Sequence, residues 1–184
     1  MRIIGGELGR RRINPPANMP HTRPTTDIAK EGLFNIIENN LDIEELKTLD
    51  LFGGTGSISY ELASRGAKEI SIVEKDIKMY EFIKKTSQEL KLENLKVIKA
   101  DVFKFINQTS EKYDFIFAGP PYALENIDDL PKLIFEKSLL NHKGWFVLEH
   151  TPRNDYKAFP FYSTERNYGT TIFSIFVEKR AFSY

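Results

Sequence analysis

Residues able to hold a ligand gather in a glycine-rich stretch, Asp50-Leu51-Phe52-Gly53-Gly54-Thr55-Gly56, and in Glu74 beyond it. Glycine residues allow positive φ angles and let the backbone approach a ligand closely. A helix that begins beyond such a turn directs its free N–H groups into the same space. An acidic residue about 20 positions after the loop can bind both hydroxyls of a ribose. The pattern predicts a site for a ribose-containing ligand, although an ordinary strand-to-helix turn also uses such glycines.

Asp50 and Ser59 bear on the kind of ligand. The dinucleotide fingerprint G-x-G-x-x-G would need its third glycine at Ser59, so tight packing of a pyrophosphate is disfavoured. Asp50 precedes the loop, where an acidic residue could instead receive a cationic group such as an amino-acid ammonium. A nicotinamide dehydrogenase stays as an alternative that a test of NAD binding would decide.

The second stretch with chemical potential is Gly119-Pro120-Pro121-Tyr122. Consecutive prolines fix the backbone and donate no N–H groups, so nearby carbonyl groups can face a ligand instead of a sheet neighbour. Tyr122 offers a ring on which a nucleic-acid base could stack. The alternative is a purely structural Pro-Pro turn.

The elements that must position these residues alternate between strands and helices. Strands are predicted over 48–52, 69–74, 94–100, 113–118 and 144–149, and helices over 57–65, 77–90, 102–106 and 127–140. Thr25 or Thr26 would cap an earlier helix with Ile28, Leu33, Ile36 and Ile37 as its apolar stripe. Two β-rich runs, 159–166 and 170–179, predict a hairpin through residues 167–169.

This order predicts an α/β fold with a doubly wound, mostly parallel seven-stranded sheet and an antiparallel C-terminal hairpin. Residues 1–13 predict a small N-terminal β-hairpin arm. The carboxyl ends of the strands would line a ligand crevice. Asp101 follows the third strand, where it could accept a hydrogen bond from an adenine amine or simply cap the next helix.

The composition of the chain limits the classes of protein to which it can belong. The 184 residues suit one domain, with a basic arm and linker over 1–24 and a core over 25–184. No apolar run approaches about 18 residues and no signal-peptide core is present, so we expect a cytoplasmic protein without a membrane partner. The absence of cysteine excludes a disulfide framework and covalent thiolate catalysis at carbon 5 of a pyrimidine. The three histidines lack ligand spacing, so no metal is expected.

Charge is distributed unevenly along a chain whose formal net charge is zero. Residues 1–24 alone carry a net charge of +4, and Arg10, Arg11 and Arg12 stand together there. The planar fork of arginine binds phosphate oxygens in pairs. These three residues are therefore either a phosphate-contacting arm or a solvated charged edge.

These motifs resemble those of known enzymes. Pro120-Pro121-Tyr122 is similar to the motif of amino-methyltransferases that use S-adenosylmethionine (SAM). End to end, the chain resembles the bacterial RsmD family, which methylates the exocyclic N2 of one guanine in 16S ribosomal RNA. The segments that carry the resemblance are Met1-Arg2-Ile3-Ile4-Gly5-Gly6 with the arginine cluster, Arg23-Pro24-Thr25-Thr26-Asp27, Leu33-Phe34-Asn35, Asp50-Leu51-Phe52-Gly53-Gly54-Thr55-Gly56, Ser64-Arg65-Gly66-Ala67, Val73-Glu74 and Pro120-Pro121-Tyr122-Ala123-Leu124.

The resemblance implies a role in SAM binding for a set of residues. Asp50, Gly54 and Gly56 would hold the methionine end, Glu74 would bind the ribose, and Asp101 would lie beside the adenine. Three residues of the motif before the first helix and one loop glycine complete the implied cofactor site: Arg23, Thr25, Thr26 and Gly53.

The resemblance also implies how RNA is bound. Gly119, Pro120, Pro121 and Tyr122 would form the catalytic turn, in which Pro120 and Tyr122 hold a flipped guanine. Arg10, Arg11 and Arg12 would bind rRNA phosphates. The implied partner is 16S rRNA or the 30S particle, and we expect a monomer.

Gly119 departs from the family pattern, which has Asp or Asn at this position. An aromatic amine is a poor nucleophile because its lone pair is delocalised into the ring. An oxygen that accepts its N–H would orient the lone pair and stabilise the charge that develops on nitrogen. Loss of one such preorganised group costs about 10²–10³ in rate. SAM and RNA binding are thus better supported than rapid turnover.

Two alternatives share the same residues. One keeps the cofactor and changes the substrate to adenine N6 in DNA or to a protein glutamine amide. The other is an RNA-binding protein without catalytic activity, which is suggested by Gly119.

Overall fold

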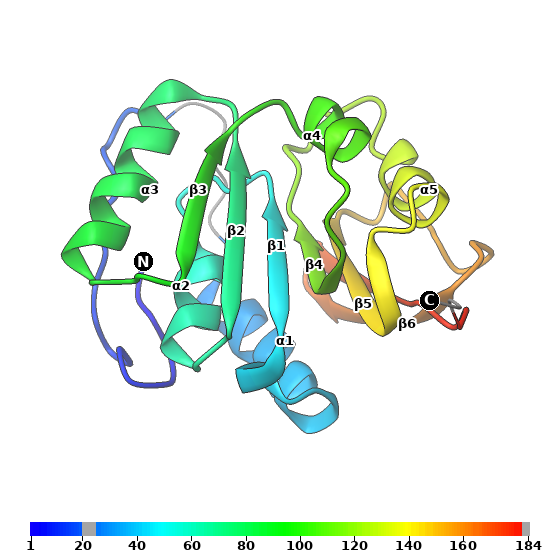
Figure 1. Cartoon of the computed structure of the whole chain (residues 1–184), viewed down its shortest axis with the longest axis horizontal. Helices are drawn as coiled ribbons and strands as arrows, with labels where there is room; N and C mark the ends of the chain where they lie inside the picture. The colour runs from blue at the N-terminus through cyan, green and yellow to red at the C-terminus, as the bar shows by residue number, and fades with distance from the viewer. Residues whose placement is uncertain (20–24, 182–184) are drawn as a thin grey trace.

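The computed structural model describes residues 1–19 and 25–181. Seven strands within these ranges form one sheet with the order β3-β2-β1-β4-β5-β7-β6 (Figure 1). Their bounds are Lys47–Leu51 (β1), Glu69–Glu74 (β2), Leu95–Lys99 (β3), Tyr113–Ala118 (β4), Leu140–His150 (β5), Tyr162–Tyr168 (β6) and Thr171–Val177 (β7). Strands β1 to β5 pair in parallel, and β7 pairs antiparallel with both β5 and β6. The predicted mixed sheet with an antiparallel C-terminal hairpin is confirmed.

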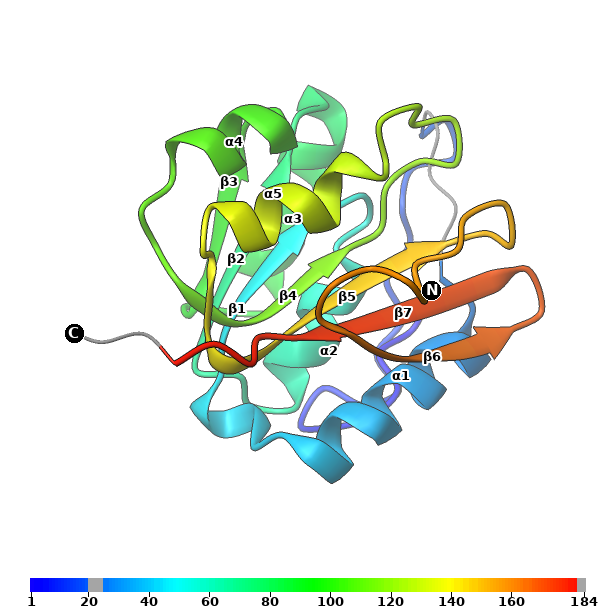
Figure 2. The same cartoon turned by 90° about the vertical axis from the view of Figure 1, so that its right-hand side faces the viewer.

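Helices cover both faces of the sheet. They span Asp27–Asn40 (α1), Ser57–Ser64 (α2), Ile77–Glu89 (α3), Val102–Gln108 (α4) and Asp129–Glu136 (α5), with a short 3₁₀ helix, η1, over Ile43–Glu45. Figure 2 shows α1 and α2 on one side of the sheet and α4 and α5 on the other. None of the helices in the described ranges is long and apolar enough to cross a membrane.

Alternation along the central strands builds a separate apolar core on each face. On β4, Phe115 and Phe117 join the cluster beneath α1 and α2, whereas Ile116 and Ala118 join the cluster beneath α4 and α5. Successive side chains of a strand point to opposite faces, so a strand buried on both sides is apolar throughout. This arrangement leaves the carboxyl ends of the strands as the place where polar residues can meet a ligand.

The apolar stripe predicted for α1 is wrong at Ile28. Thr26 caps the helix by accepting a hydrogen bond from the amide of Ala29 at 3.2 Å. Ala29, Leu33 and Ile37 face the core, whereas Ile28 is 75% exposed. Each residue turns the helix by about 100°, so Ile28 lies on a different face from Ala29.

The boundary between α5 and β5 also differs from the prediction of a helix over 127–140. The helix ends at Glu136, and Ser138 adopts a positive φ of 51°. The amide of Leu139 then bonds the carbonyl of Ile134 at 3.1 Å, which closes the helix end. Strand β5 therefore begins at Leu140, before the predicted start at residue 144.

The predicted N-terminal hairpin is not confirmed, because residues 1–13 form no named strand. They double back through one isolated antiparallel bridge between Arg2 and Arg12. Backbone bonds from Ile3 to Arg11 and from Ile13 to Met1, each 2.9 Å long, hold the two halves together.

Glu61 of α2 anchors this N-terminal segment to the fold. Its fully buried carboxylate accepts the amides of Ile4 and Gly5, both at 2.9 Å. It also pairs with Arg65 at 2.9 Å and with buried Lys30 of α1 at 3.4 Å. Burial lowers the pKa of Lys30, and the charge of Glu61 opposes that shift.

We expect Glu61→Gln to lower the free energy of unfolding by about 3–5 kcal/mol, because it leaves a buried lysine without its carboxylate. Chemical denaturation monitored by circular dichroism measures the change. Glu89→Gln is the control, since Glu89 is exposed and pairs with Lys85 one turn away on α3. The control should shift the value by less than about 0.5 kcal/mol. Equal small effects in the two variants would contradict the anchoring role.

Candidate functional site

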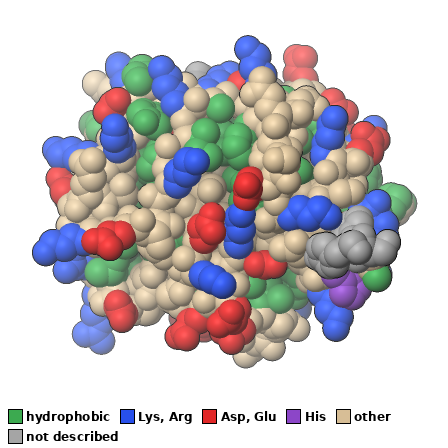
Figure 3. All heavy atoms as spheres, viewed as in Figure 1, with side chains coloured by type: hydrophobic (Ala, Val, Ile, Leu, Met, Phe, Trp, Pro, Cys, Tyr) green, Lys and Arg blue, Asp and Glu red, His purple; other side chains and the backbone are tan. Residues whose placement is uncertain are grey.

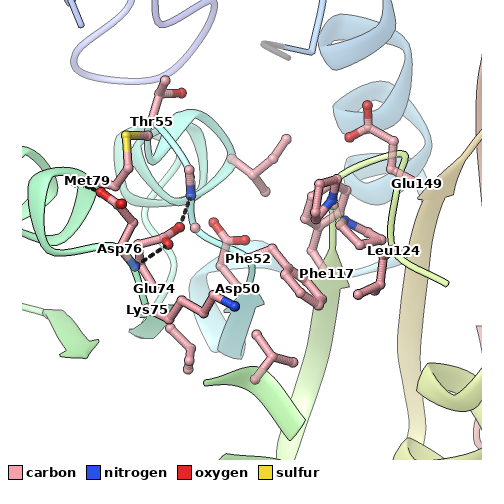
Figure 4. Close-up of a pocket in the computed structure, with 18 of the residues that line it drawn as sticks. Asp50, Phe52, Thr55, Glu74, Lys75, Asp76, Met79, Phe117, Leu124 and Glu149 are labelled. Atoms are coloured by element: carbon pink, nitrogen blue, oxygen red, sulfur yellow. Dashed lines mark hydrogen bonds between the residues drawn. The ribbon is translucent and has the colours of Figure 1, made fainter. Parts of the chain in front are cut away.

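A cavity of about 700 Å³ opens at the carboxyl ends of β1, β2, β4 and β5. This volume falls within the range of roughly 300–1,000 Å³ typical of small-molecule sites. Its walls come from the loop after β1, the ends of β2 and β5, the start of α4 and the turn after β4. Figure 4 shows Asp50 and Glu74 on one side of the cavity and Glu149 on the other, with Phe117 between them. The two sequence stretches therefore line one cavity.

Asp50 is the buried acidic group of this cavity, with only 2% of its surface exposed. Burial raises the pKa of Asp50 to about 7, while a 2.7 Å hydrogen bond from the hydroxyl of Ser59 opposes the rise. The nearby charge of Glu74 raises the pKa further. A cation bound beside Asp50 would favour its ionised form. Ser59, which stands where a dinucleotide-binding loop would have glycine, instead positions this carboxyl group.

Glu74 connects the glycine loop to the start of α3. Its Oε2 accepts the amide of Gly54 at 2.8 Å, and its Oε1 accepts the amide of Asp76 at 2.9 Å (Figure 4). Asp76 in turn caps α3 by accepting the amides of Lys78 and Met79. Each carboxylate oxygen can accept a second hydrogen bond, so the loop contacts are compatible with binding of ribose hydroxyls.

The backbone of the loop requires glycine at specific positions. Gly54 and Gly56 have φ angles of 58° and 84°. A Cβ atom on Gly56 would lie 2.5 Å from Cζ of Tyr60, so a side chain is excluded there. Gly53 and Gly54 line the cavity, whereas Gly56 shapes the loop as the N-cap residue of α2.

Phe52 lines the cavity and was not predicted as a site residue. Its φ angle is 61°, which is an outlier for a bulky side chain. The next amide, that of Gly53, bonds the carbonyl of Val73 at 2.9 Å and holds the turn against β2. No signal in the sequence marks this conformation, because Phe rarely adopts it.

Asp101, Thr25 and Thr26 were each expected either to cap a helix or to contact a ligand. Asp101 caps α4 by accepting the amide of Lys104 at 3.1 Å, and it also lines the cavity. Thr26 is the cap of α1, whereas Thr25 lines the cavity. Arg23 lies outside the described residues. Ligand contacts for these residues stay predictions.

The turn after β4 supplies the opposite wall of the cavity. Gly119, Pro120, Pro121 and Tyr122 all line it. The amide of Gly119 bonds the carbonyl of Leu51 at 3.3 Å, which joins this turn to the end of β1. Tyr122 is 44% exposed, so its ring stands where an incoming base could reach it. Arg10, Arg11 and Arg12 are exposed on the N-terminal segment and lie outside the set of lining residues.

Glu149 at the carboxyl end of β5 is a lining residue that sequence reasoning missed. Its Oε2 accepts a hydrogen bond from the hydroxyl of Thr25 at 3.1 Å. A signal was present, since an acidic residue at the end of a parallel strand had already marked Glu74 and Asp101. The prediction overlooked it because none of the recognised motifs reaches the end of this strand.

Comparisons with known proteins identify the relatives of this chain. The family model described as Conserved hypothetical protein 95 matches residues 1–177. Ribosomal RNA small subunit methyltransferase D of Haemophilus influenzae is 33% identical over 153 residues, which cover 81% of this chain and 78% of the relative. The protein of the same name from Buchnera aphidicola subsp. Baizongia pistaciae is 31% identical over 149 residues, covering 81% and 75%.

Solved structures extend the likeness to the fold. The structure of a hypothetical protein from Thermus thermophilus matches with a TM-score of 0.84 and 25% identity. The match covers 96% of this chain and 98% of that one. The family model spans nearly the whole sequence, and both of these relatives exceed 30% identity over most of their length. The chain therefore belongs to the family described as Conserved hypothetical protein 95, the RsmD family, as its sequence motifs predicted.

Proposed function

We propose that this protein is a SAM-dependent methyltransferase that methylates the exocyclic N2 of a guanine in 16S rRNA. The observation that carries the proposal is the cavity in which Asp50, Glu74 and the Pro120-Pro121-Tyr122 turn meet. Relatives named ribosomal RNA small subunit methyltransferase D support rRNA as the substrate class. An rRNA substrate also fits a cytoplasmic location.

The donor set of the cavity fits SAM. Asp50 would receive the ammonium of the methionine end, and the glycine loop would approach its carboxylate through backbone amides. Glu74 would bind the ribose hydroxyls, and Asp101 would lie near the adenine. When bound, SAM supplies an electrophilic methyl group on a positively charged sulfur.

The opposite wall would hold the base. Pro120 directs its carbonyl without any competing N–H of its own, and Tyr122 offers an aromatic face for stacking. A base within a duplex could not enter such a cavity, so the target guanine must be unpaired or flipped out. Adenine N6 and glutamine amides are the competing substrates for the same turn.

The proposal is tested by incubating the protein with radiolabelled SAM and either unmodified 16S rRNA or 30S particles. We expect label in RNA, and nucleoside analysis should identify it as N2-methylguanosine. Label in N6-methyladenine after a parallel reaction with DNA, or label in protein, would contradict the choice of substrate. RNA binding with normal SAM binding but no turnover would instead support the RNA-binding alternative that Gly119 suggested.

Asp50 should make binding of S-adenosylhomocysteine (SAH) depend on pH. With a pKa of about 7 in the free protein, the protonated fraction of Asp50 falls from about nine-tenths at pH 6 to about one-tenth at pH 8. The ammonium of SAH binds the ionised form, so calorimetry should show about tenfold tighter binding at pH 8. Asp50→Asn should bind more weakly and lose this dependence. A dependence that persists in Asp50→Asn would exclude Asp50 as its source.

The arginine cluster should supply affinity for RNA rather than catalysis. On the face shown in Figure 3, basic and acidic side chains are interspersed, so a local cluster is needed to attract phosphates. Replacing Arg10, Arg11 and Arg12 together with Gln should weaken rRNA binding. It should also reduce the slope of log binding constant against log salt concentration by about 0.7–0.9 for each phosphate contact that is lost. Fluorescence anisotropy at several salt concentrations measures both effects.

The matched control replaces three lysines on the outer face of α3: Lys78, Lys84 and Lys85, each with Gln. This variant removes the same amount of charge from another surface. If both triple variants lost the same affinity, the arm would act only through net charge and not through defined contacts.

A further inference from the structure

The space beside Gly119 is approached by a carboxylate from the neighbouring strand. Strands β4 and β5 pair in parallel with Ala118 opposite Leu148, so Gly119 and Glu149 follow side by side. A Cβ atom on Gly119 would lie 3.3 Å from Oε2 of Glu149 and 3.1 Å from Cε1 of Phe117. The Glu149 carboxylate thus lies where a side chain at position 119 would begin.

We propose that Glu149 is the acceptor that binds the N–H of the target amine in place of the missing side chain at Gly119. The inference rests on the proposed function and assigns one of its catalytic groups. Glu149 lines the same cavity as Pro120 and Tyr122. In Figure 4 it faces the site from the side opposite Asp50, which separates the acceptor from the predicted ammonium site.

The setting of Glu149 suits this role. It is half-buried, so its charge is only partly screened by water. The hydroxyl of Thr25 donates to Oε2 at 3.1 Å and thereby fixes the orientation of the carboxylate. A carboxylate can accept about four hydrogen bonds, so it can hold the Thr25 hydroxyl and a substrate N–H together. The charge of Glu149 also contributes to the raised pKa of Asp50, which places both groups in one electrostatic environment.

Methyl transfer to guanine N2 can proceed with Glu149 as the hydrogen-bond and proton acceptor. The lone pair of guanine N2 forms the new bond to the methyl carbon, and the electron pair of the broken carbon–sulfur bond stays on sulfur. The amine nitrogen gains positive charge as the bond forms, and the negative Glu149 carboxylate stabilises that charge. The amine then loses its proton to the carboxylate, which passes it to water.

Gly119 becomes necessary in this arrangement. An aspartate there would bring a second carboxylate close to Glu149, and two like charges at such a distance disfavour ionisation of both. The φ angle of Gly119 is not positive, so the backbone itself would accept a side chain. The glycine therefore leaves room for the neighbouring acceptor.

The test measures single-turnover methylation of 16S rRNA by the wild type, Glu149→Ala, Glu149→Gln, Gly119→Asp and the Gly119→Asp/Glu149→Ala double variant. We expect Glu149→Ala to slow the step about 10²–10³-fold. Glu149→Gln should retain more of the rate than Glu149→Ala, because its amide oxygen still accepts a hydrogen bond. Glu165→Gln on β6, a carboxylate outside the cavity lining, is the control and should keep the wild-type rate.

The double variant gives the decisive comparison. Gly119→Asp should not accelerate the wild type. The double variant, however, should react at least about tenfold faster than Glu149→Ala alone. A rate for Glu149→Ala within about threefold of the wild type would overturn the inference. Acceleration of the wild type by Gly119→Asp would also overturn it, because the acceptor would then have been missing.

A binding measurement gives a readout apart from activity. Sinefungin is a SAM analogue with an amine at the place of the sulfonium methyl, and SAH lacks any group there. At pH 8, where Asp50 is mostly ionised with or without Glu149, Glu149→Ala and Glu149→Gln should weaken sinefungin binding about fivefold or more and leave SAH binding nearly unchanged. Equal changes for the two ligands, or none, would place Glu149 away from the reacting atoms. A wild type that methylates no RNA would refute the proposed function and the acceptor role together. An active wild type whose Glu149 variants react at the same rate would refute the acceptor role alone.

Discussion

The site depends on one carboxylate that binds two backbone amides. Glu74 accepts the amide of Gly54 with one oxygen and the amide of Asp76 with the other. These bonds fix the glycine loop after β1 against the cap of α3, so the floor of the cavity is set before any ligand arrives. Charge-assisted hydrogen bonds are stronger than neutral ones, which suits a loop without regular structure. Asp50 and the turn after β4 are then positioned by the strands on either side.

Local rules predicted most of the sheet and several of the residues that line the cavity. Strand β2 and the cap at Asp76 followed from apolar runs and capping residues, and the shared edge of parallel strands brought Gly54 and Tyr122 to one cavity. The failures have physical causes. The face of Ile28 depended on the rotational phase of α1, and the end of α5 depended on the positive φ of Ser138, neither of which side-chain type determines.

Glu149 illustrates what a motif omits when it is read along one strand. A missing side chain at Gly119 suggests lost activity if only the motif is considered. In the folded chain the neighbouring strand brings a carboxylate to the same space, 3.3 Å from the place of a Cβ atom on Gly119. Function belongs to the arrangement of groups in a site rather than to a sequence position. Pairing between β4 and β5 is long-range information, which a motif does not contain.

Phe52 carries a further consequence for how far this protein can be stabilised. A left-handed backbone at a bulky residue costs roughly 1–3 kcal/mol. Relaxing that strain with glycine would remove an aromatic wall from the cavity, since the strained residue and the lining residue are the same. A substitution that relieves the backbone strain at Phe52 would therefore stabilise the protein only at the expense of ligand binding. Improvement by design would have to come from residues outside the cavity, on the helices and the antiparallel edge.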